Sequence, residues 1–120
     1  MSSIPSYILQ QLIAGANPLN LPDGFQFALR NTVGSGTLTG VVKLEVDGVA
    51  VEPARLFVGL GEPTTPASEI TRQKPWAFQY GQGLVIKAAG KPLEPGHHQI
   101  ALTVDTIEIG RITVPLTLKF

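Results

Sequence analysis

Histidines are the first side chains to examine for chemistry in this sequence, and it holds only two, His97 and His98. They are adjacent in a segment that alternates like a strand, and neighbouring strand residues point to opposite faces of a sheet. The two imidazoles therefore cannot bind one metal ion together. Because His98 shares the phase of Ile100 at the mouth of a turn, we expect it to cap backbone groups at the rim of the core. We expect His97 to be solvated, and we favour the structural role of His98 over catalysis, because a histidine acts as a general base only with a positioned partner.

The acidic side chains and the glycine pairs also favour structural roles. Most of the carboxylates considered lie in or beside turns, where they bind backbone N–H groups, and no pair has a spacing that demands a general acid and base. These residues are Asp23, Asp47, Glu52, Glu62, Glu94 and Asp105. Gly34-Ser35-Gly36 lacks the lysine and the helix that follow in a phosphate-binding loop, so we interpret it as a flexible connection. The sequence thus predicts no catalytic residue and no metal ligand in this chain.

An aromatic segment is the best candidate for binding. Trp76, Phe78 and Tyr80 repeat at period two after Pro75, so their rings would line one face of an extended segment. Tryptophan and tyrosine are favoured at interfaces, and exposed rings also stack on sugars. The alternative, that all three rings fill the core, stays open at this stage.

The elements that must position these residues are strands. Thirteen glycines and ten prolines divide the chain into short runs, and most runs alternate with period two. The sequence predicts an all-β chain, a single immunoglobulin-like antiparallel β-sandwich of about seven or eight strands that forms one domain over residues 1–120. The clearest expected strands are 25–31, 37–46, 55–60, 84–88, 100–104 and 112–118. Residues 7–13 fit either a short helix or a strand.

Two local signals sharpen this prediction. Asp47-Gly48, between Val46 and Val49, is typical of a type I′ hairpin turn, because both central residues of that turn need a positive φ. Pro115 falls inside the last strand and cannot donate to a ladder, which predicts a sheet edge or a bulge there. Along residues 41–46 we expect Val42, Leu44 and Val46 on one face.

Composition limits the partners and the compartment. Nine basic and nine acidic residues cancel and are scattered, so we expect no nucleic-acid partner and no membrane partner. The start of the chain lacks the features of a signal peptide, and no apolar run approaches the length of a membrane span. The absence of cysteine makes a cytoplasmic location the simpler expectation. Charged residues are 15% of the chain and hydrophobic ones 43%, which hints at a permanent partner.

The order of motifs resembles the small β subunit of bacterial C-glycoside deglycosidases over nearly the whole chain. The matching segments are 4–9, 23–31, 36–41, 46–48, 67–70 and 93–98, the last of these reading Leu-Glu-Pro-Gly-His-His. Each segment is also ordinary β-sandwich turn chemistry, so the order and spacing carry the resemblance.

This resemblance implies a non-catalytic accessory subunit of a carbon–carbon lyase. The catalytic α subunit would be a barrel with a divalent metal, commonly manganese, and this chain would bind no cofactor. The complex would cleave the C–C bond of 3-oxo-C-glycosides, the metal stabilising the enolate that forms. We expect Trp76, Phe78 and Tyr80 to pack on the α subunit and to shape its active site. The alternatives are a free-standing carbohydrate-binding module and a structural immunoglobulin-like module.

Overall fold

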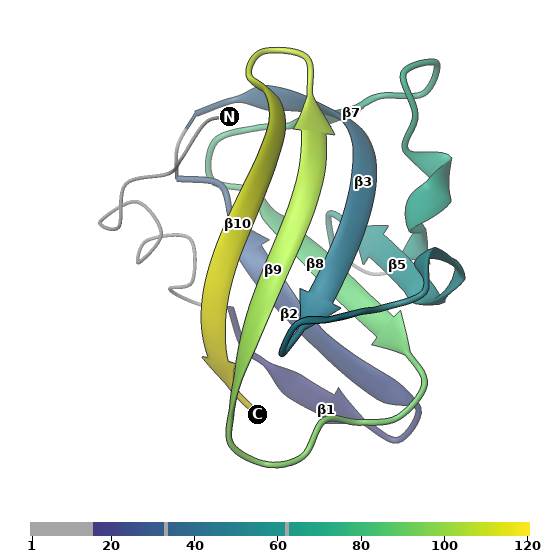
Figure 1. Ribbon diagram of the computed structural model, residues 1–120. Coiled ribbons are helices and arrows are strands. Elements are labelled where there is room, and N and C mark those ends of the chain that lie inside the picture. Colours follow the sequence, from purple (N-terminus) through teal and green to yellow (C-terminus); the bar gives the residue numbers. More distant parts are fainter. Residues whose placement is uncertain (1–15, 33, 62) are drawn as a thin grey trace.

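Two antiparallel sheets face each other in the computed structural model, which describes residues 16–32, 34–61 and 63–120 (Figure 1). The predicted all-β sandwich is therefore confirmed. The first sheet has the order β1-β2-β8-β5-β6. Its strands are β1 (Leu19–Leu21), β2 (Gly24–Arg30), β8 (Gly83–Ala89), β5 (Leu56–Gly59) and β6 (Thr65–Pro66).

The second sheet carries the long strands and has the order β10-β9-β3-β4, with β7 paired to the start of β3. Its strands are β10 (Gly110–Lys119), β9 (His97–Thr106), β3 (Gly36–Val46), β4 (Val49–Ala50) and β7 (Trp76–Phe78). Two short 3₁₀ turns, η1 (Pro53–Arg55) and η2 (Ala67–Glu69), flank β5.

The described residues thus form ten strands, more than the seven or eight expected. The difference lies in β1, β4, β6 and β7, which have only two or three residues each. Of these four, only β7 showed alternation in the sequence, at Trp76 and Phe78. The six longer strands fall where the sequence predicted them. Three end residues are exceptions: Asn31 follows β2, Arg55 belongs to η1, and Leu60 follows β5. The prediction for residues 7–13 lies outside the described residues.

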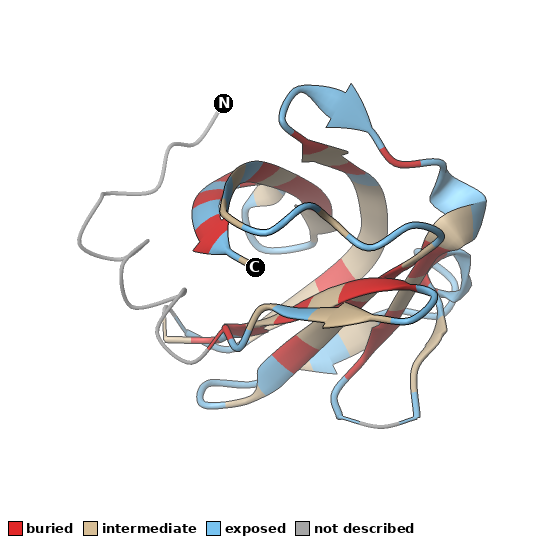
Figure 2. Ribbon diagram, turned by 90° about the horizontal axis from the view of Figure 1, so that it is seen from below, coloured by how far each residue is buried: buried red, intermediate tan, exposed pale blue. Residues whose placement is uncertain are grey.

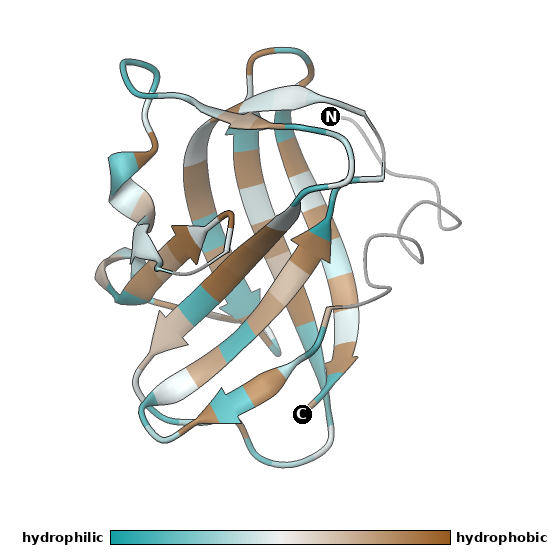
Figure 3. Cartoon of the chain, turned by 180° about the vertical axis from the view of Figure 1, so that it is seen from behind, coloured by the Kyte–Doolittle hydropathy of each residue, from teal (hydrophilic) through white to brown (hydrophobic). Residues whose placement is uncertain are grey.

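Side chains between the sheets form a cluster of buried aliphatic and aromatic groups. Figure 2 shows the buried positions alternating with exposed ones along the strands, and Figure 3 shows the matching bands of hydropathy. Phe27, Leu44 and Leu102 are at most 1% exposed and come from both sheets. Burial of such inward-facing side chains, at roughly 25 cal/mol per Å² of apolar surface, is the main force that holds the sheets together.

The face predicted for residues 41–46 is confirmed for Leu44 and Val46 but wrong for Val42, because β3 contains bulges. Its register with β9 shifts between Leu38 and Gly40 and again between Val41 and Lys43. A bulge inserts an extra residue and reverses the alternation beyond it. Val41 consequently packs against the core, whereas the sequence pattern had placed Val42 on that face.

Both turn predictions are confirmed. Asp47 has φ 51° and Gly48 has φ 83°, as a type I′ turn requires, and β4 returns directly beside the end of β3. Pro115 lies in β10, which is the last strand of its sheet and pairs with β9 alone. Among the described residues no helix is long and apolar enough to cross a membrane.

Replacing Leu44 by alanine tests the core. Leu44 is fully buried in the middle of β3, so the cavity left behind should lower the free energy of unfolding by about 2–5 kcal/mol. Denaturant unfolding followed by circular dichroism measures the change. Lys43→Ala, at the exposed neighbouring position, is the control and should change stability by less than about 0.5 kcal/mol. Equal losses in both variants would contradict the assigned faces.

Candidate functional site

The aromatic segment divides into two half-buried rings and one exposed ring. Trp76 and Phe78 share a face of β7, are half-buried and pack against the core. Tyr80 is 67% exposed. The split arises because β7 ends at Phe78, so the alternation that predicted a single stripe stops before Tyr80 is reached.

Asn31 anchors the turn that carries Tyr80. Asn31 is only 5% exposed, and its side-chain amide donates to the carbonyl oxygens of Phe78 and Gly34, both at 2.9 Å. The Gly81 N–H donates to the Asn31 carbonyl at 2.7 Å, and the Gly34 N–H donates to the Asn31 Oδ1 at 3.2 Å. The segment that the sequence suggested to be a flexible connection is therefore tied down. An asparagine at a strand end before a glycine-rich turn was the signal for this, since such side chains bind nearby backbone.

Further hydrogen bonds fix the tip of the same turn. The Tyr80 N–H donates to Ser35 Oγ at 3.2 Å, and the Gln79 N–H donates to Gln82 Oε1 at 2.7 Å. The Tyr80 ring is thus presented to solvent from a backbone that is hydrogen-bonded on both sides.

The turn between β9 and β10 presents two more apolar side chains at this end of the sandwich. Ile107 is 66% exposed and Ile109 is 54% exposed. The Ile107 N–H donates to the Thr37 carbonyl at 3.1 Å, and Thr37 pairs on its other side with Ala77 of β7. The start of β3 therefore lies between this turn and the aromatic segment. We call Tyr80, Ile107 and Ile109 the end surface.

Glu108 sits between the two isoleucines, but its carboxylate turns back to the fold. Its two oxygens accept hydrogen bonds from the Thr37 N–H at 2.8 Å and the Thr37 hydroxyl at 2.9 Å. The bond from the Thr37 N–H is the main cause that lowers the pKa of Glu108. An acidic group that is already bound within the chain leaves the two isoleucines as the free side chains of the turn.

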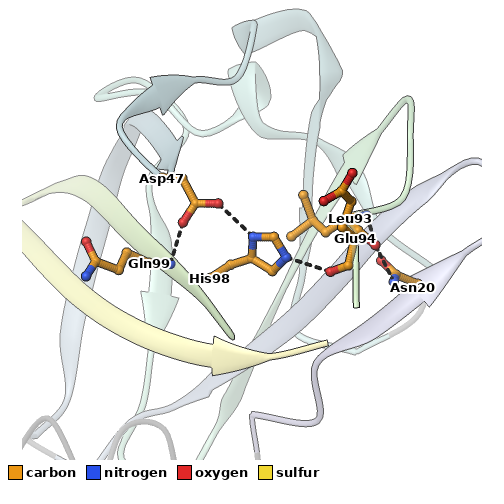
Figure 4. A network of polar contacts seen from close by, with 6 residues as sticks. All are labelled: Asn20, Asp47, Leu93, Glu94, His98 and Gln99. Atoms are coloured by element: carbon orange, nitrogen blue, oxygen red, sulfur yellow. Dashed lines mark hydrogen bonds and ion pairs between the residues drawn. The ribbon is translucent and has the colours of Figure 1, made fainter. Parts of the chain in front are cut away.

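A polar network closes the opposite end, as Figure 4 shows around His98. His98 Nδ1 lies 2.7 Å from Asp47 Oδ2, and Nε2 lies 2.6 Å from the carbonyl oxygen of Glu94. A carbonyl oxygen and an ionised carboxylate can only accept hydrogen bonds, so both ring nitrogens must carry protons. The geometry therefore holds His98 as a cation. In agreement, the hydrogen bond to Asp47 is the largest cause that raises the pKa of His98 above its ordinary 6.5.

Further hydrogen bonds of Asp47 and Asn20 extend this network. We call the whole network the clasp, and its residues are Asn20, Asp47, Leu93, Glu94, His98 and Gln99. Asp47 Oδ1 accepts from the Gln99 N–H at 2.9 Å, and the bond to His98 is the first cause that lowers the pKa of Asp47. Asn20 of β1 donates to the Leu93 carbonyl at 2.8 Å and accepts from the Leu93 N–H at 2.9 Å. The clasp therefore links the hairpin after β3, the start of β9 and the first sheet.

Aromatic packing completes the closed end. Phe120 lies edge-on to the His98 ring, with 5.9 Å between centroids, and edge-on to Phe25 at 5.6 Å. The backbones of Phe120 and Gly96 exchange two hydrogen bonds, of 2.9 and 3.0 Å. The prediction that His98 caps backbone at the core rim is confirmed, and His97 is exposed, also as expected. Because both nitrogens of His98 are engaged, its ring has no free lone pair to act as a base.

A shallow open hollow of about 450 Å³ lies over the outer face of β3, β9 and β10. It is lined by small and polar side chains such as Gln99, Ala101, Pro115 and Thr117, with Glu45 as the ionisable one. Glu45 faces Lys43 at 3.6 Å. Over the described parts of the chain, no group of three or more His, Cys, Asp or Glu is placed to hold a metal ion.

Comparison with known proteins decides the family. The family model described as hydroxymethylglutaryl-CoA reductase, N-terminal domain, matches residues 8–117. The chain belongs to this family. None of the curated proteins compared with the chain matches it.

Membership of the hydroxymethylglutaryl-CoA reductase N-terminal domain family corrects one expectation. The sequence motifs implied a subunit of a C-glycoside deglycosidase, and that function is wrong, because the family match points to a different enzyme. The motifs misled since each is also ordinary turn chemistry that unrelated sandwiches share. The barrel-fold partner, the metal it would hold and the contact of Trp76, Phe78 and Tyr80 with it stay predictions.

The clasp predicts how stability depends on pH. Because the pKa of His98 is raised in the folded chain, its contribution is fully present below pH 6.5 and is lost as the pH rises through the folded pKa. His98→Gln should remove this decline, because an amide can donate to the Glu94 carbonyl but does not titrate. Unfolding free energy measured across this range, with an NMR titration of the ring, tests the effect.

His97→Gln is the matched control for this experiment. His97 is the exposed neighbour on the same strand, so its replacement should leave the hydrogen bonds of His98 in place and the unfolding free energy close to that of the wild-type chain. A folded-state pKa of His98 at or below 6.5 would contradict the assigned charge.

Proposed function

We propose that this chain is a non-catalytic β-sandwich domain that binds the catalytic part of a hydroxymethylglutaryl-CoA reductase through its end surface. The observation that carries the proposal is the exposure of Tyr80, Ile107 and Ile109 on a hydrogen-bonded backbone at one end of the sandwich. Family membership supports the choice of partner, because the family is described as an N-terminal domain of that enzyme.

The physical case for binding rests on the rigidity of the end surface. A large apolar side chain that is already fixed in position loses little conformational freedom when it is covered, so more of its burial energy becomes binding energy. Covering one isoleucine contributes roughly 1.5–3 kcal/mol. Tyrosine adds a hydroxyl that can bind a partner group, which is one reason it recurs at the centres of interfaces.

Charge supports an interface held by apolar contact. The chain has nine basic and nine acidic residues, so no net field steers a charged partner to it. Near the turn of the end surface, Asp105 is paired with Arg111 at 2.9 Å and Glu108 is bound to Thr37. Polar groups that are already paired form a rim around the apolar side chains, and binding should depend little on salt.

Two further parts of the proposal concern chemistry and compartment. We place the catalytic groups and any metal ion on the partner, and the domain in the cytoplasm, where a chain without cysteine is at home. The alternative of a carbohydrate-binding module loses support from the packing of Trp76 and Phe78 against the core, because only Tyr80 of the three rings is left with an open face for a sugar.

Substitution of Tyr80 tests the proposal. Tyr80→Ala in this chain should weaken binding to the catalytic domain of the reductase from the same genome by about tenfold or more, as a loss of roughly 1.4 kcal/mol or greater implies. Ile107→Ser should act in the same direction. Isothermal titration calorimetry at low and high salt measures both affinities.

Val49→Ser is the matched control, because Val49 is 70% exposed and lies in the hairpin at the clasp end of the molecule. It should bind as the wild-type chain does. Equal affinities of the Tyr80 and Val49 variants would refute the end surface, and failure of the wild-type chain to bind the reductase would refute the partner.

A further inference from the structure

The outer edge of β10 is a second surface that needs explanation. In the described part of the sheet, β10 pairs with β9 along its whole length and has no strand on its other side. An open edge of this length is a template for pairing with another chain, and natural sheets carry devices that prevent such pairing.

The hydrogen bonds of the closed end reveal which backbone groups of β10 face this open edge. Phe120 exchanges two bonds with Gly96, so its backbone points toward β9. Backbone direction alternates along a strand, and the β9–β10 register runs without a shift. The residues whose backbone points outward are Arg111, Thr113, Pro115, Thr117 and Lys119.

The other side of β9 gives the same answer independently. The Gln99 carbonyl accepts from the Asp47 N–H at 2.7 Å, so the Gln99 backbone points toward β3 and away from β10. Ala101 follows in the same phase and stands opposite Pro115. Pro115 therefore sits where its ring costs no bond within the sheet and removes a donor from the centre of the open edge.

We infer that Pro115 and the charges near the ends of β10 keep this chain from pairing with a second copy of itself edge to edge. In a two-fold antiparallel pairing of full overlap, Pro115 would face Pro115 of the other copy. Neither ring has an N–H to donate, and each ring would crowd the carbonyl oxygen opposite it. In the same register Arg111, which is paired with Asp105 of β9, faces Lys119 of the other copy, and like charges directly opposite each other are destabilising.

The buried side chains of β10 are the reason that edge-to-edge pairing must be prevented. Val114, Leu116 and Leu118 alternate with the outward positions and are buried. Pairing through β10 would continue the sheet and its apolar face into the second copy. A chain that must stay free for a different partner gains from a blocked edge, an inference that holds whether or not the end surface binds the reductase.

A variant that lacks both Pro115 and the positive charge of Lys119 tests the inference. Pro115→Thr restores a donor with a residue that suits strands, and Lys119→Glu turns the repulsion of Arg111 into attraction. We expect the double variant to form dimers and the wild-type chain to stay monomeric in sedimentation velocity, a tightening of self-association of at least about tenfold. Hydrogen exchange at the Thr113 and Thr117 amides should slow in the dimer.

The control keeps Pro115 and changes its neighbour. Thr117→Val with Lys119→Glu has the same reversal of charge and a β-branched residue at the next outward position, and it should remain monomeric. Denaturant unfolding confirms that each variant is folded. A monomeric Pro115→Thr/Lys119→Glu chain, or dimers of the control, would overturn the inference.

Discussion

The position of His98 between two acceptors is the constraint on which the rest of the structure depends. Its ring lies between the Asp47 carboxylate and the Glu94 carbonyl, and neither partner can donate a hydrogen bond to it. The imidazole must therefore be charged in the pH range in which this contact stabilises the fold. Because Asp47 also binds the Gln99 N–H, the same contact sets where β9 begins relative to the end of β3. The register of β9 with β3 and β10 then follows.

The two ends of the sandwich use their hydrogen bonds differently. β9 runs from His97 at the clasp to Thr106 beside the end surface, a span of ~30 Å at the usual strand rise. The polar groups of the clasp bind one another, and the rings of His98 and Phe25 pack edge-on against Phe120. The far end uses hydrogen bonds of Asn31, Ser35 and Glu108 to fix turns whose apolar side chains stay outside. One end therefore pairs its polar groups within the chain, and the other leaves three large side chains exposed, which is why we propose it as the binding end.

The architecture could be predicted from sequence because alternation and turn chemistry act locally. Phe25 to Arg30 and Ile100 to Val104 alternate cleanly, and Asp47-Gly48 requires a type I′ turn. The bulge at Val41 could not be predicted, since it depends on the register with β9, a strand distant in the sequence. The same limit applied to the candidate sites. The alternation of Trp76, Phe78 and Tyr80 was visible, but the end of β7 at Phe78 separates the exposed ring from the packed ones. His98 was placed correctly at the rim, but its charge depends on Asp47, which is far along the chain.

The family could not be predicted from the motifs because sandwich turns recur in unrelated proteins. Leu93 to His98 matched a deglycosidase pattern, yet these residues serve the clasp, a purely structural need. Asn31 was overlooked for a related reason. Its role as an anchor for Phe78 and Gly81 joins segments that only the folded chain brings together.

We propose that the end surface, and no other face, meets the reductase. The most direct test is a titration of the isotope-labelled chain with the unlabelled catalytic domain, followed by backbone NMR. We expect chemical-shift changes or line broadening to concentrate at residues 78–82 and 106–110, while Asp47, His98 and Gln99 keep their free-state signals. Changes centred on the clasp or on the outer face of β9 and β10, or no change at saturating partner, would contradict it.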